Sequence, residues 1–431
     1  MKRDPIVLGK NYVLNGEDIE KSLPNSNVLV VGSSGTGKSQ SVLFPTIARS
    51  QYSNSILSYA KEYDAYRMGK FLRTKGYKVH ILNITRPEKS TISFDPLMSI
   101  QSYQDIDSLA TSIVENAIKE TVDDYWSAKA KPMLASLIAA AFMVSKRDNG
   151  PCMRDVFKFF DKMVPQERSE SVTTDMDDLY KKIEKADSDC YAVREYKAWS
   201  SLPYRTAACV RDTLSAALST VFPEEIRKVM QEKPQFNIEK FIHNKEALFV
   251  ITCATETSQQ YYANLFYRDT ERQLLRYAAE CPHGKLPREI RYIFDDFACT
   301  SPIQGWAYDM SIFRSASISA IMLLQSETQL EMIYKSEAPI IRQNSSLYCY
   351  FAGGFDDKSC EIVAKRMGIQ YQEVLFAPLG NVYIMQSGRA PVCIERYDTP
   401  NSEEFKQYNN VNNRNRKHSK CKEREDENES I

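Results

Sequence analysis

A phosphate-binding motif near the start of the chain constrains its fold and chemistry more than any other feature. The apolar segment Val28–Val31 runs directly into G-x-x-x-x-G-K-S, which ends at Ser39. The glycines of such a loop let backbone N–H groups turn toward one point at the start of the next helix, where an anion is favoured. The strand context that a P-loop requires is present. The residues expected to hold phosphate are Gly32, Ser33, Ser34, Gly35, Thr36, Gly37, Lys38 and Ser39.

Two side chains of this motif have distinct expected roles. The Lys38 amine can reach the β- and γ-phosphates of a nucleotide, and the Ser39 hydroxyl can ligate Mg²⁺. We therefore expect ATP and Mg²⁺ as the bound groups.

Composition excludes several classes of protein. A chain of 431 residues, 43% hydrophobic and 26% charged, is typical of a soluble globular protein with two or three domains. Lys+Arg and Asp+Glu both total 56, so nucleic-acid contact would need a local basic patch. Ten cysteines without a C-x-x-C pair favour a reducing cytoplasm over a zinc site or a disulfide framework.

Apolar patterning gives no membrane anchor in this sequence. The first residues lack the apolar core of a signal peptide. The longest apolar stretch, residues 133–144, is too short to cross a bilayer and is expected to be a buried helix. A cytoplasmic location is therefore predicted, with any attachment at the inner face of the membrane made through a partner.

Seven short apolar segments are typical of strands. Most are continuously apolar, as in a parallel sheet covered on both faces. Helix-length segments separate the first three, which indicates βαβ units and an α/β fold with a mainly parallel central sheet. The expected strands are Val28–Val31, Ser55–Tyr59, Val79–Leu82, Ala247–Thr252, Arg291–Phe294, Ala320–Leu324 and Leu347–Phe351.

The middle of the chain has a different pattern. Helix-like segments follow one another over residues 100–235, which predicts an inserted all-α domain. It would divide a nucleotide-binding domain into residues 1–99, with the P-loop, and residues 236–398. Residues 399–431 lose apolar content and are expected to form a disordered polar tail. Two interpretations of the insert stay open, recognition of partner proteins or DNA and simple packing.

A second half of the nucleotide site is expected at Asp295 and Asp296. These carboxylates follow an apolar segment, and a P-loop ATPase needs acidic groups at the end of a strand beside the P-loop strand. We expect Asp295 to hold Mg²⁺ and Asp296 to polarise the attacking water. An ordinary strand end with two solvated acids is the alternative.

Two further residues are candidates for catalysis. Gln325 follows the strand Ala320–Leu324, and its amide can donate and accept hydrogen bonds near a γ-phosphate. Arg314 could stabilise phosphoryl charge across a subunit boundary. An ordinary strand-end amide and an ordinary surface arginine are equally open interpretations.

Several segments, in their order and spacing, resemble the type IV secretion coupling proteins, the TraG/TraD-type ATPases of conjugation. The resemblance spans roughly residues 6–397. It is carried by N-V-L-V-V-G-x-x-G-x-G-K-S at Asn27–Ser39, K-G-Y-K-V at Lys75–Val79, F-D-P-L at Phe94–Leu97, Y-W at Tyr125–Trp126, I-F-D-D-F-A at Ile293–Ala298 and L-Q-S-x-x-Q-L at Leu324–Leu330. It implies a RecA-like motor, commonly a hexameric ring, that hands single-stranded DNA and its attached relaxase to a secretion channel.

Four features depart from the family pattern. The family begins with membrane-spanning helices, whereas this chain starts almost at the nucleotide domain. The family's D-P-K-G-E segment stands here as Tyr59–Tyr63, Y-A-K-E-Y. Asp296 replaces a glutamate and Ala316 a second arginine. These departures keep open a non-hydrolysing ATP-binding adaptor of the transfer apparatus, and an FtsK/HerA-like DNA pump is a further alternative.

Overall fold

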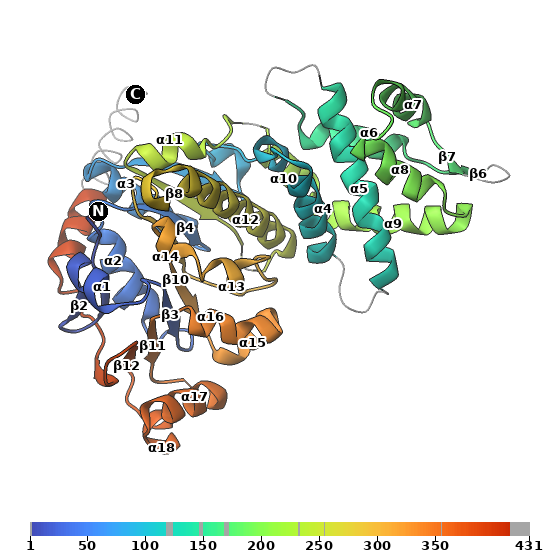
Figure 1. The fold of residues 1–431 in the computed structure, drawn as a ribbon. Helices are drawn as coiled ribbons and strands as arrows, with labels where there is room; N and C mark the ends of the chain where they lie inside the picture. Colours follow the sequence, from blue (N-terminus) through green and yellow to red (C-terminus); the bar gives the residue numbers. More distant parts are fainter. Residues whose placement is uncertain are drawn as a thin grey trace, which may run out of the picture. The chain divides into compact units, whose positions relative to one another are not determined.

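The computed structural model describes residues 2–117, 124–145, 150–167, 172–231, 233–253, 255–354 and 356–413, which form two compact units (Figure 1). The first unit comprises Met1–Thr85, Asn237–Ala254 and Leu274–Ile431, and the second comprises Arg86–Phe236 and Thr255–Gln273. The second unit therefore begins before the predicted insert and also takes in the first part of α12 (Thr257–Glu280).

A nine-stranded sheet forms the centre of the first unit, in the order β13-β12-β11-β3-β10-β9-β4-β8-β5. The strands from β11 to β5 run parallel, whereas β12 and β13 add to the β11 edge in antiparallel fashion. This confirms the predicted α/β fold, and each of the seven predicted strands is present. The bounds are β3 Val28–Val31, β4 Asn54–Tyr59, β5 Lys78–Asn83, β8 Glu246–Ile251, β9 Ile290–Phe294, β10 Ile318–Leu324, β11 Leu347–Phe351, β12 Asn381–Gln386 and β13 Val392–Glu395.

The strand order corrects one expectation. The acidic strand end was expected on a strand directly beside the P-loop strand, but β10 lies between β3 and β9. Ile321 of β10 pairs with Val28 of β3 and with Ile293 of β9. The P-loop and the acidic pair therefore flank the end of β10, where Gln325 follows.

One face of the sheet is covered by α2 (Phe44–Ala48), α3 (Glu62–Thr74) and a helix over residues 403–413. The ring of Tyr408 lies 5.0 Å from that of Phe44 and 5.8 Å from that of Phe71, between centroids. The predicted disordered tail is therefore wrong for residues 403–413, because Tyr408 buries its ring against the sheet domain. Residues 414–431 of that predicted tail lie outside the described residues.

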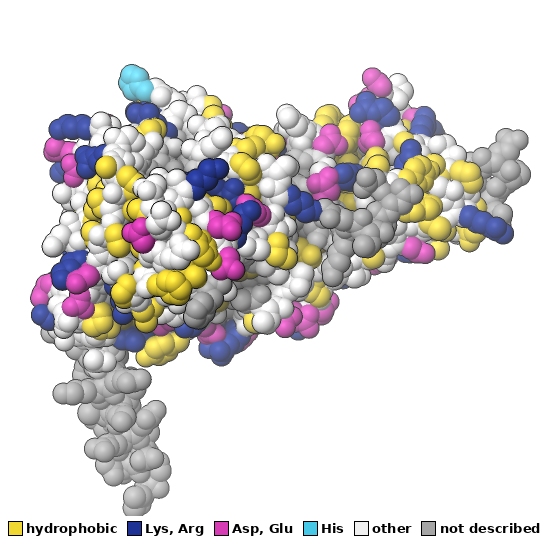
Figure 2. Space-filling model, turned by 90° about the horizontal axis from the view of Figure 1, so that it is seen from below, with side chains coloured by type: hydrophobic (Ala, Val, Ile, Leu, Met, Phe, Trp, Pro, Cys, Tyr) yellow, Lys and Arg dark blue, Asp and Glu magenta, His cyan; other side chains and the backbone are white. Residues whose placement is uncertain are grey.

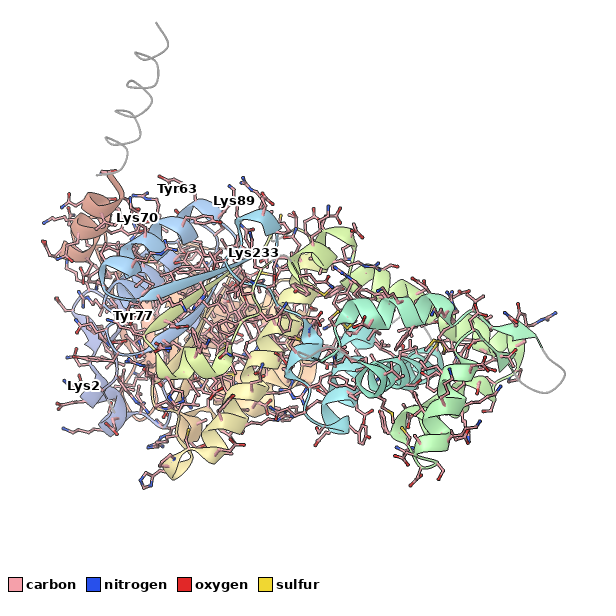
Figure 3. The ribbon with its side chains drawn as sticks, turned by 90° about the horizontal axis from the view of Figure 1, so that it is seen from above. Lys2, Tyr63, Lys70, Tyr77, Lys89 and Lys233 are labelled. Atoms are coloured by element: carbon pink, nitrogen blue, oxygen red, sulfur yellow. The ribbon has the colours of Figure 1, made fainter. Side chains whose placement is uncertain are left out.

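Side chains of α3 and of the turn after it differ in their exposure. Tyr63 and Lys70 lie at the outer side of the helix (Figure 3), and Tyr63 is exposed. Tyr77, in the turn between α3 and β5, is buried, and its hydroxyl donates to the carbonyl of Ser53 at 2.9 Å.

The opposite face of the sheet is covered by aromatic packing around Trp306. Its ring lies 5.2 Å from Tyr292, 5.3 Å from Phe294 and 5.1 Å from Phe313. The remaining elements of the first unit are β1 Ile6–Gly9, β2 Tyr12–Leu14, α1 Gly16–Ser22, α11 Ile238–His243, α13 Trp306–Asp309, α14 Phe313–Ala316, α15 Glu327–Tyr334, α16 Ala338–Gln343, α17 Asp357–Met367 and α18 Tyr371–Leu375.

The described residues of the second unit are mainly helical, and among them β6 (Gln166–Glu167) pairs in antiparallel fashion with β7 (Val172–Thr173). Its central helix α5 packs against α4, α8 and α9. Among the described residues, Tyr125–Val144 is a helix segment long and apolar enough to cross a membrane, yet 56% of it is buried. The helices are α4 Tyr103–Ala117, α5 Asp124–Val144, α6 Met153–Lys162, α7 Asp177–Ala186, α8 Tyr191–Ser200, α9 Tyr204–Val221 and α10 Glu224–Val229.

Candidate nucleotide site

The P-loop follows β3 with the backbone geometry that its glycines predict. Gly35 and Gly37 have φ angles of +82° and +96°, a region that residues with a side chain rarely adopt. A Cβ on Gly32 would lie 2.8 Å from the Cβ of Phe351, so only glycine fits there. The Thr36 hydroxyl donates to the carbonyl of Ser33 at 2.8 Å and closes the turn.

The helix after the P-loop begins with a widened turn. Ser39–Leu43 is π-helical and continues into α2, whose second residue is Pro45. Proline lacks the N–H that an α-helical bond to the residue four positions earlier requires. This accounts for the wider turn next to the loop, a form that is frequent at functional sites.

Lys38 folds back over the loop that it follows. Its ammonium donates to the carbonyls of Gly32 and Ser33, the second at 3.0 Å. Burial lowers the pKa of Lys38, and the carboxylates of Asp296 and Asp295 oppose that shift. The lysine is thus a nearly buried cation that faces both acids.

Asp295 contacts the last residue of the P-loop motif from the other side of β10. The Ser39 hydroxyl donates directly to the Asp295 carboxylate. Burial raises the pKa of Asp295, while the Ser39 hydrogen bond and the charges of Lys38 and Lys61 oppose this. The two residues predicted to share Mg²⁺ are therefore in contact.

Asp296 points to a different set of partners. Burial raises the pKa of Asp296. A hydrogen bond from Gln325 and the charges of Lys38 and Lys61 oppose this by lowering the pKa. The structure thus brings Gln325 to Asp296 as well as to the end of β10. Lys61, which stands within the altered Tyr59–Tyr63 segment, is a further cation of this site.

Gln329 is a residue of the site that the sequence reasoning did not assign a role. Its side-chain oxygen accepts from the backbone N–H of Gln325 at 3.0 Å, and its side-chain nitrogen donates to the carbonyl of Ala298 at 3.1 Å. It therefore ties the end of β10 to the loop after the acidic pair. The one sequence feature that points to Gln329 is the L-Q-S-x-x-Q-L motif. Its spacing places Ser326 at the N-cap of α15 and Gln329 in the first turn of that helix.

Arg314 is not brought to this site in its own chain. It lies in α14, before β10 begins, whereas the P-loop and acidic pair lie at the end of β10. The seven residues of β10 span roughly 23 Å at about 3.3 Å per residue. Arg314 is exposed and Ala316 is buried at the same far edge.

Tyr59 occupies the position where the resembling family has an aspartate. Its ring is buried in the sheet core, 5.7 Å from Phe249 between centroids. Burial raises the pKa of Tyr59 well above its ordinary value, and the charge of Asp295 adds to the effect. This position therefore contributes packing beneath Asp295 and no carboxylate.

The donor set suits a nucleoside triphosphate with Mg²⁺. Ser39 and Asp295 offer two oxygen ligands, and Mg²⁺ commonly completes its shell with waters and substrate phosphates. In the described part of the chain no group of three His, Cys, Asp or Glu side chains forms a metal cluster. A magnesium ion here would therefore depend on the nucleotide for its remaining ligands.

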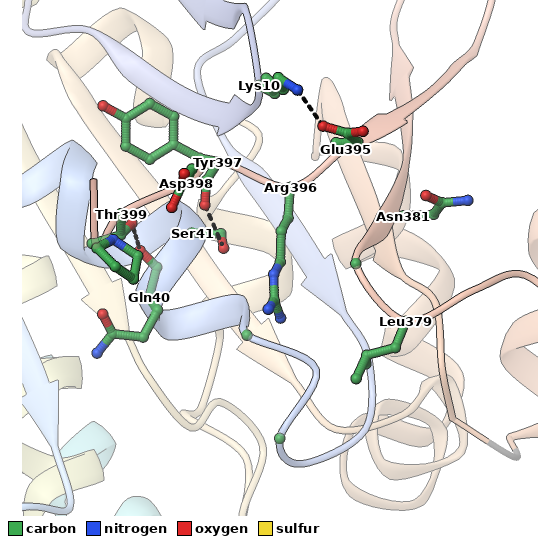
Figure 4. A pocket seen from close by; sticks show the side chains of 14 residues that line it. Lys10, Gln40, Ser41, Leu379, Asn381, Glu395, Arg396, Tyr397, Asp398 and Thr399 are labelled. Carbon is green, nitrogen blue, oxygen red and sulfur yellow. Dashed lines mark hydrogen bonds and ion pairs between the residues drawn. The ribbon is translucent and has the colours of Figure 1, made fainter. Parts of the chain in front are cut away.

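A cavity of 760 Å³ lies beside the P-loop, on the side of Gly37, Gln40 and Ser41 (Figure 4). Its other walls come from Lys10, between β1 and β2, and from two C-terminal segments, one at the start of β12 and one at the end of β13. These two segments contribute Leu379, Gly380, Asn381, Glu395, Arg396, Tyr397, Asp398, Thr399 and Pro400.

Comparison with known proteins gives both a family and a fold. The family described as Type IV secretory system Conjugative DNA transfer matches residues 1–371. No protein with a curated description matches the sequence significantly.

Among solved structures, similarity extends over most of the chain. The bacterial conjugative coupling protein TrwBdeltaN70 with sulphate is 17% identical, with 86% of this chain and 85% of that chain covered and a TM-score of 0.64. The plasmid coupling protein TrwB with ADP and Mg²⁺ is 18% identical, with 86% of this chain and 84% of that chain covered and a TM-score of 0.64. VirB4 of Thermoanaerobacter pseudethanolicus is 13% identical, with 93% of this chain and 98% of that chain covered and a TM-score of 0.56. At these identities the likeness shows the RecA-like fold.

Proposed function

The chain belongs to the Type IV secretory system Conjugative DNA transfer family, and we propose that it binds and hydrolyses ATP to deliver DNA with its attached relaxase to a type IV secretion channel. The observation that carries the nucleotide part is the hydrogen bond from Ser39 to Asp295. It joins a P-loop and an acidic strand end in the arrangement that Mg²⁺ and a triphosphate require. Solved structures of the similar TrwB hold an ATP analogue or ADP with Mg²⁺, which supports the same ligands here.

Each side chain of the site has a task in this proposal. Lys38 exchanges its two carbonyl partners for phosphate oxygens, and Ser39 with Asp295 binds Mg²⁺. Asp296, held by Gln325, orients a water and accepts its proton at a carboxylate oxygen. Burial favours this step because it raises the pKa of Asp296 and makes the carboxylate a stronger base. Bound ATP supplies the γ-phosphoryl group whose transfer to water drives the cycle.

The assembly and the DNA contact rest on family membership. Figure 2 shows acidic and basic side chains interspersed over the visible face, so that face has no broad basic area. We infer a homo-hexamer that passes single-stranded DNA through a ring. Arg314 supports this arrangement, since it lies at the sheet edge away from its own P-loop and is exposed, as a residue acting on a neighbouring subunit must be.

We infer that the protein works in the cytoplasm, at the inner face of the membrane through its channel partners. The packing of α5 among α4, α8 and α9 supports this inference, because it gives the most apolar helix a role inside its own unit.

Steady-state phosphate release, measured with and without single-stranded DNA, tests the proposal. We expect Mg²⁺-dependent turnover that DNA raises, and loss of this turnover in Lys38→Ala and Asp296→Asn. Arg205→Gln changes an exposed arginine of α9 in the second unit and serves as the control. If wild-type turnover is no higher than that of Lys38→Ala, the motor proposal fails. If ATP binding is retained in that case, the alternative function is a non-hydrolysing ATP-binding adaptor, which the altered Tyr59–Tyr63 segment favours.

A further inference from the structure

Arg396 lies directly over the P-loop, although it is about 360 residues away in sequence. Its guanidinium donates to the carbonyl of Thr36 at 3.1 Å, a pair separated by 360 positions. A Cβ on Gly37 would lie 2.7 Å from the same guanidinium nitrogen. The arginine therefore fills the space above Gly37 on the side of the cavity (Figure 4).

The guanidinium of Arg396 has more donors than this structure uses. It carries five N–H donors. Among the described residues, its side chain has the Thr36 carbonyl as a partner and no carboxylate within ion-pair distance. Other arginines of this unit, Arg49, Arg291 and Arg342, are paired with glutamates. Arg396 is thus a cation beside a phosphate-binding loop with donors available to an anion.

The backbone around Arg396 is anchored to the helix that follows the P-loop. We call residues 395–402 the strap. Within the strap, the carbonyl of Tyr397 accepts from the Ser41 hydroxyl at 3.2 Å, and the Thr399 hydroxyl donates to the carbonyl of Gln40. The N–H of Arg396 donates to the carbonyl of Gly380 at 2.7 Å.

The helix over residues 403–413 fixes the far end of the strap. Glu404 forms an ion pair with Arg49, which also donates to the Tyr397 hydroxyl at 2.8 Å. Phe405 then packs on Phe44, with ring centroids 5.5 Å apart. The strap is therefore held at both ends against the helical segment that begins at Ser39.

We propose that Arg396 is a nucleotide ligand, which binds the phosphate next to the ribose while the adjoining cavity takes the nucleoside. From the P-loop and the helix after it, the cavity is lined by Gly35, Gly37, Gln40 and Ser41. Neither of the proposed Mg²⁺ ligands, Ser39 and Asp295, lines it, nor does Lys38, so the cavity adjoins the side of the loop away from the Mg²⁺ end. In a P-loop, backbone N–H groups cradle the α- and β-phosphates while the lysine serves the β- and γ-phosphates. A planar guanidinium matches phosphate oxygens in pairs, and its Thr36 contact is exchanged for them. This inference rests on the proposed ATP-binding function.

Calorimetric titration of the full chain with unlabelled ADP and with a non-hydrolysable ATP analogue, both with Mg²⁺, tests this assignment. We expect Arg396→Gln to weaken both ligands by a similar factor, about 10- to 100-fold, because the phosphate it binds is common to them. We expect Arg396→Lys to have affinities between those of the wild type and Arg396→Gln, since lysine keeps the positive charge but cannot form the paired hydrogen bonds of a guanidinium. Arg205→Gln is the matched control, with unchanged affinities.

Three outcomes separate the possibilities. If Arg396→Gln binds both ligands as the wild type does, the inference is overturned. If it lowers the melting temperature without ligand but leaves both affinities unchanged, Arg396 is a structural clamp and the inference is likewise overturned. If the wild type binds neither ligand, or Lys38→Ala binds as tightly as the wild type, it is the proposed function that fails.

A second variant tests the positioning role of the strap. Glu404→Gln removes the ion pair with Arg49 and leaves the Arg396 side chain in place. We expect a smaller loss of ADP affinity than in Arg396→Gln, and no further loss when the two substitutions are combined. Additive losses would contradict the view that the anchored strap acts through Arg396.

Discussion

Ser39 donates a hydrogen bond from its hydroxyl to the carboxylate of Asp295, a residue 256 positions further along the chain. This contact closes the site from two sides of β10, with the P-loop on one and the acidic strand end on the other. Because burial raises the pKa of Asp295, the ionised carboxylate is disfavoured until a cation compensates it. The ionised Asp295 carboxylate thus favours binding of Mg²⁺ and, without a cation, lowers the stability of the folded protein.

Asp295→Asn should separate these two effects. We expect Mg²⁺-dependent affinity for ATP to fall by at least about tenfold, since a charged ligand of the metal is lost. Without ligand, we expect the variant to have a higher free energy of unfolding than the wild type at neutral pH. The raised pKa means that wild-type stability is lost as pH rises through it, and the amide cannot ionise. Chemical denaturation from pH 4 to pH 8 measures this.

The stability difference should shrink as the pH falls toward 4, about the ordinary pKa of an aspartate, because the wild-type carboxyl is then increasingly protonated in both states. Asp189→Asn changes an exposed aspartate and is the control. A variant that is less stable than the wild type at every pH would show that the carboxylate stabilises the empty site.

Gln329 links two loops of the site, so its loss should affect turnover more than binding. In Gln329→Ala the Gln325 N–H and the Ala298 carbonyl lose their shared partner. We expect turnover to fall about 10- to 100-fold because catalytic groups shift slightly, while nucleotide affinity changes little. Phosphate release and calorimetry on the same samples measure the two, with exposed Gln372→Ala as the control. Equal losses in turnover and affinity would assign Gln329 to binding.

Local patterns in the sequence predicted the strands and much of the site. The continuous apolar run before Gly32 and the apolar run before Asp295 each identify a buried strand with polar groups at its end. In parallel strands such ends meet at one edge, which is why Lys38, Ser39, Asp295, Asp296 and Gln325 gather.

Features that depend on distant contacts were not predictable in this way. The position of β10 between β3 and β9 is a property of strand order, which short apolar segments do not encode. The helix over residues 403–413 looked polar because one row of aromatic side chains carries its packing. Arg396 stands outside any motif, and only the fold brings it to Thr36.

The buried ion pair of Arg291 and Glu289 should give the first unit a pH-dependent stability. Their side chains lie 3.0 Å apart and are almost fully buried. Burial alone would raise the pKa of Glu289, but the charges of Arg291 and Arg3 and the hydrogen bonds from Ser53 and Arg291 together lower the pKa below its ordinary value of 4.5. The pair therefore stabilises the protein above that pH, and the stabilisation is lost as pH falls through the lowered pKa.

Arg291→Met should destabilise the protein by about 3–5 kcal/mol at neutral pH, because it removes the ion-pair partner of a buried carboxylate. This deficit should shrink below about pH 5, where Glu289 can bind a proton. Adding Glu289→Gln should recover part of the loss. A deficit that stays constant from pH 4 to pH 8 would mean that lost packing, rather than the unpaired charge, dominates.

Tyr408 should make the helix over residues 403–413 an integral part of the nucleotide-binding unit. Its ring contacts Phe44 and Phe71, and the guanidinium of Arg67 lies 4.8 Å from its centroid. We expect Tyr408→Ala to lower the free energy of unfolding by about 2–4 kcal/mol, as for other large buried side chains. Tyr408→Phe is the matched control and should stay within about 1 kcal/mol of the wild type, because the hydroxyl has no hydrogen-bond partner among the described residues. Urea denaturation measures both, and wild-type stability in Tyr408→Ala would show that this helix does not pack on Phe44 in solution.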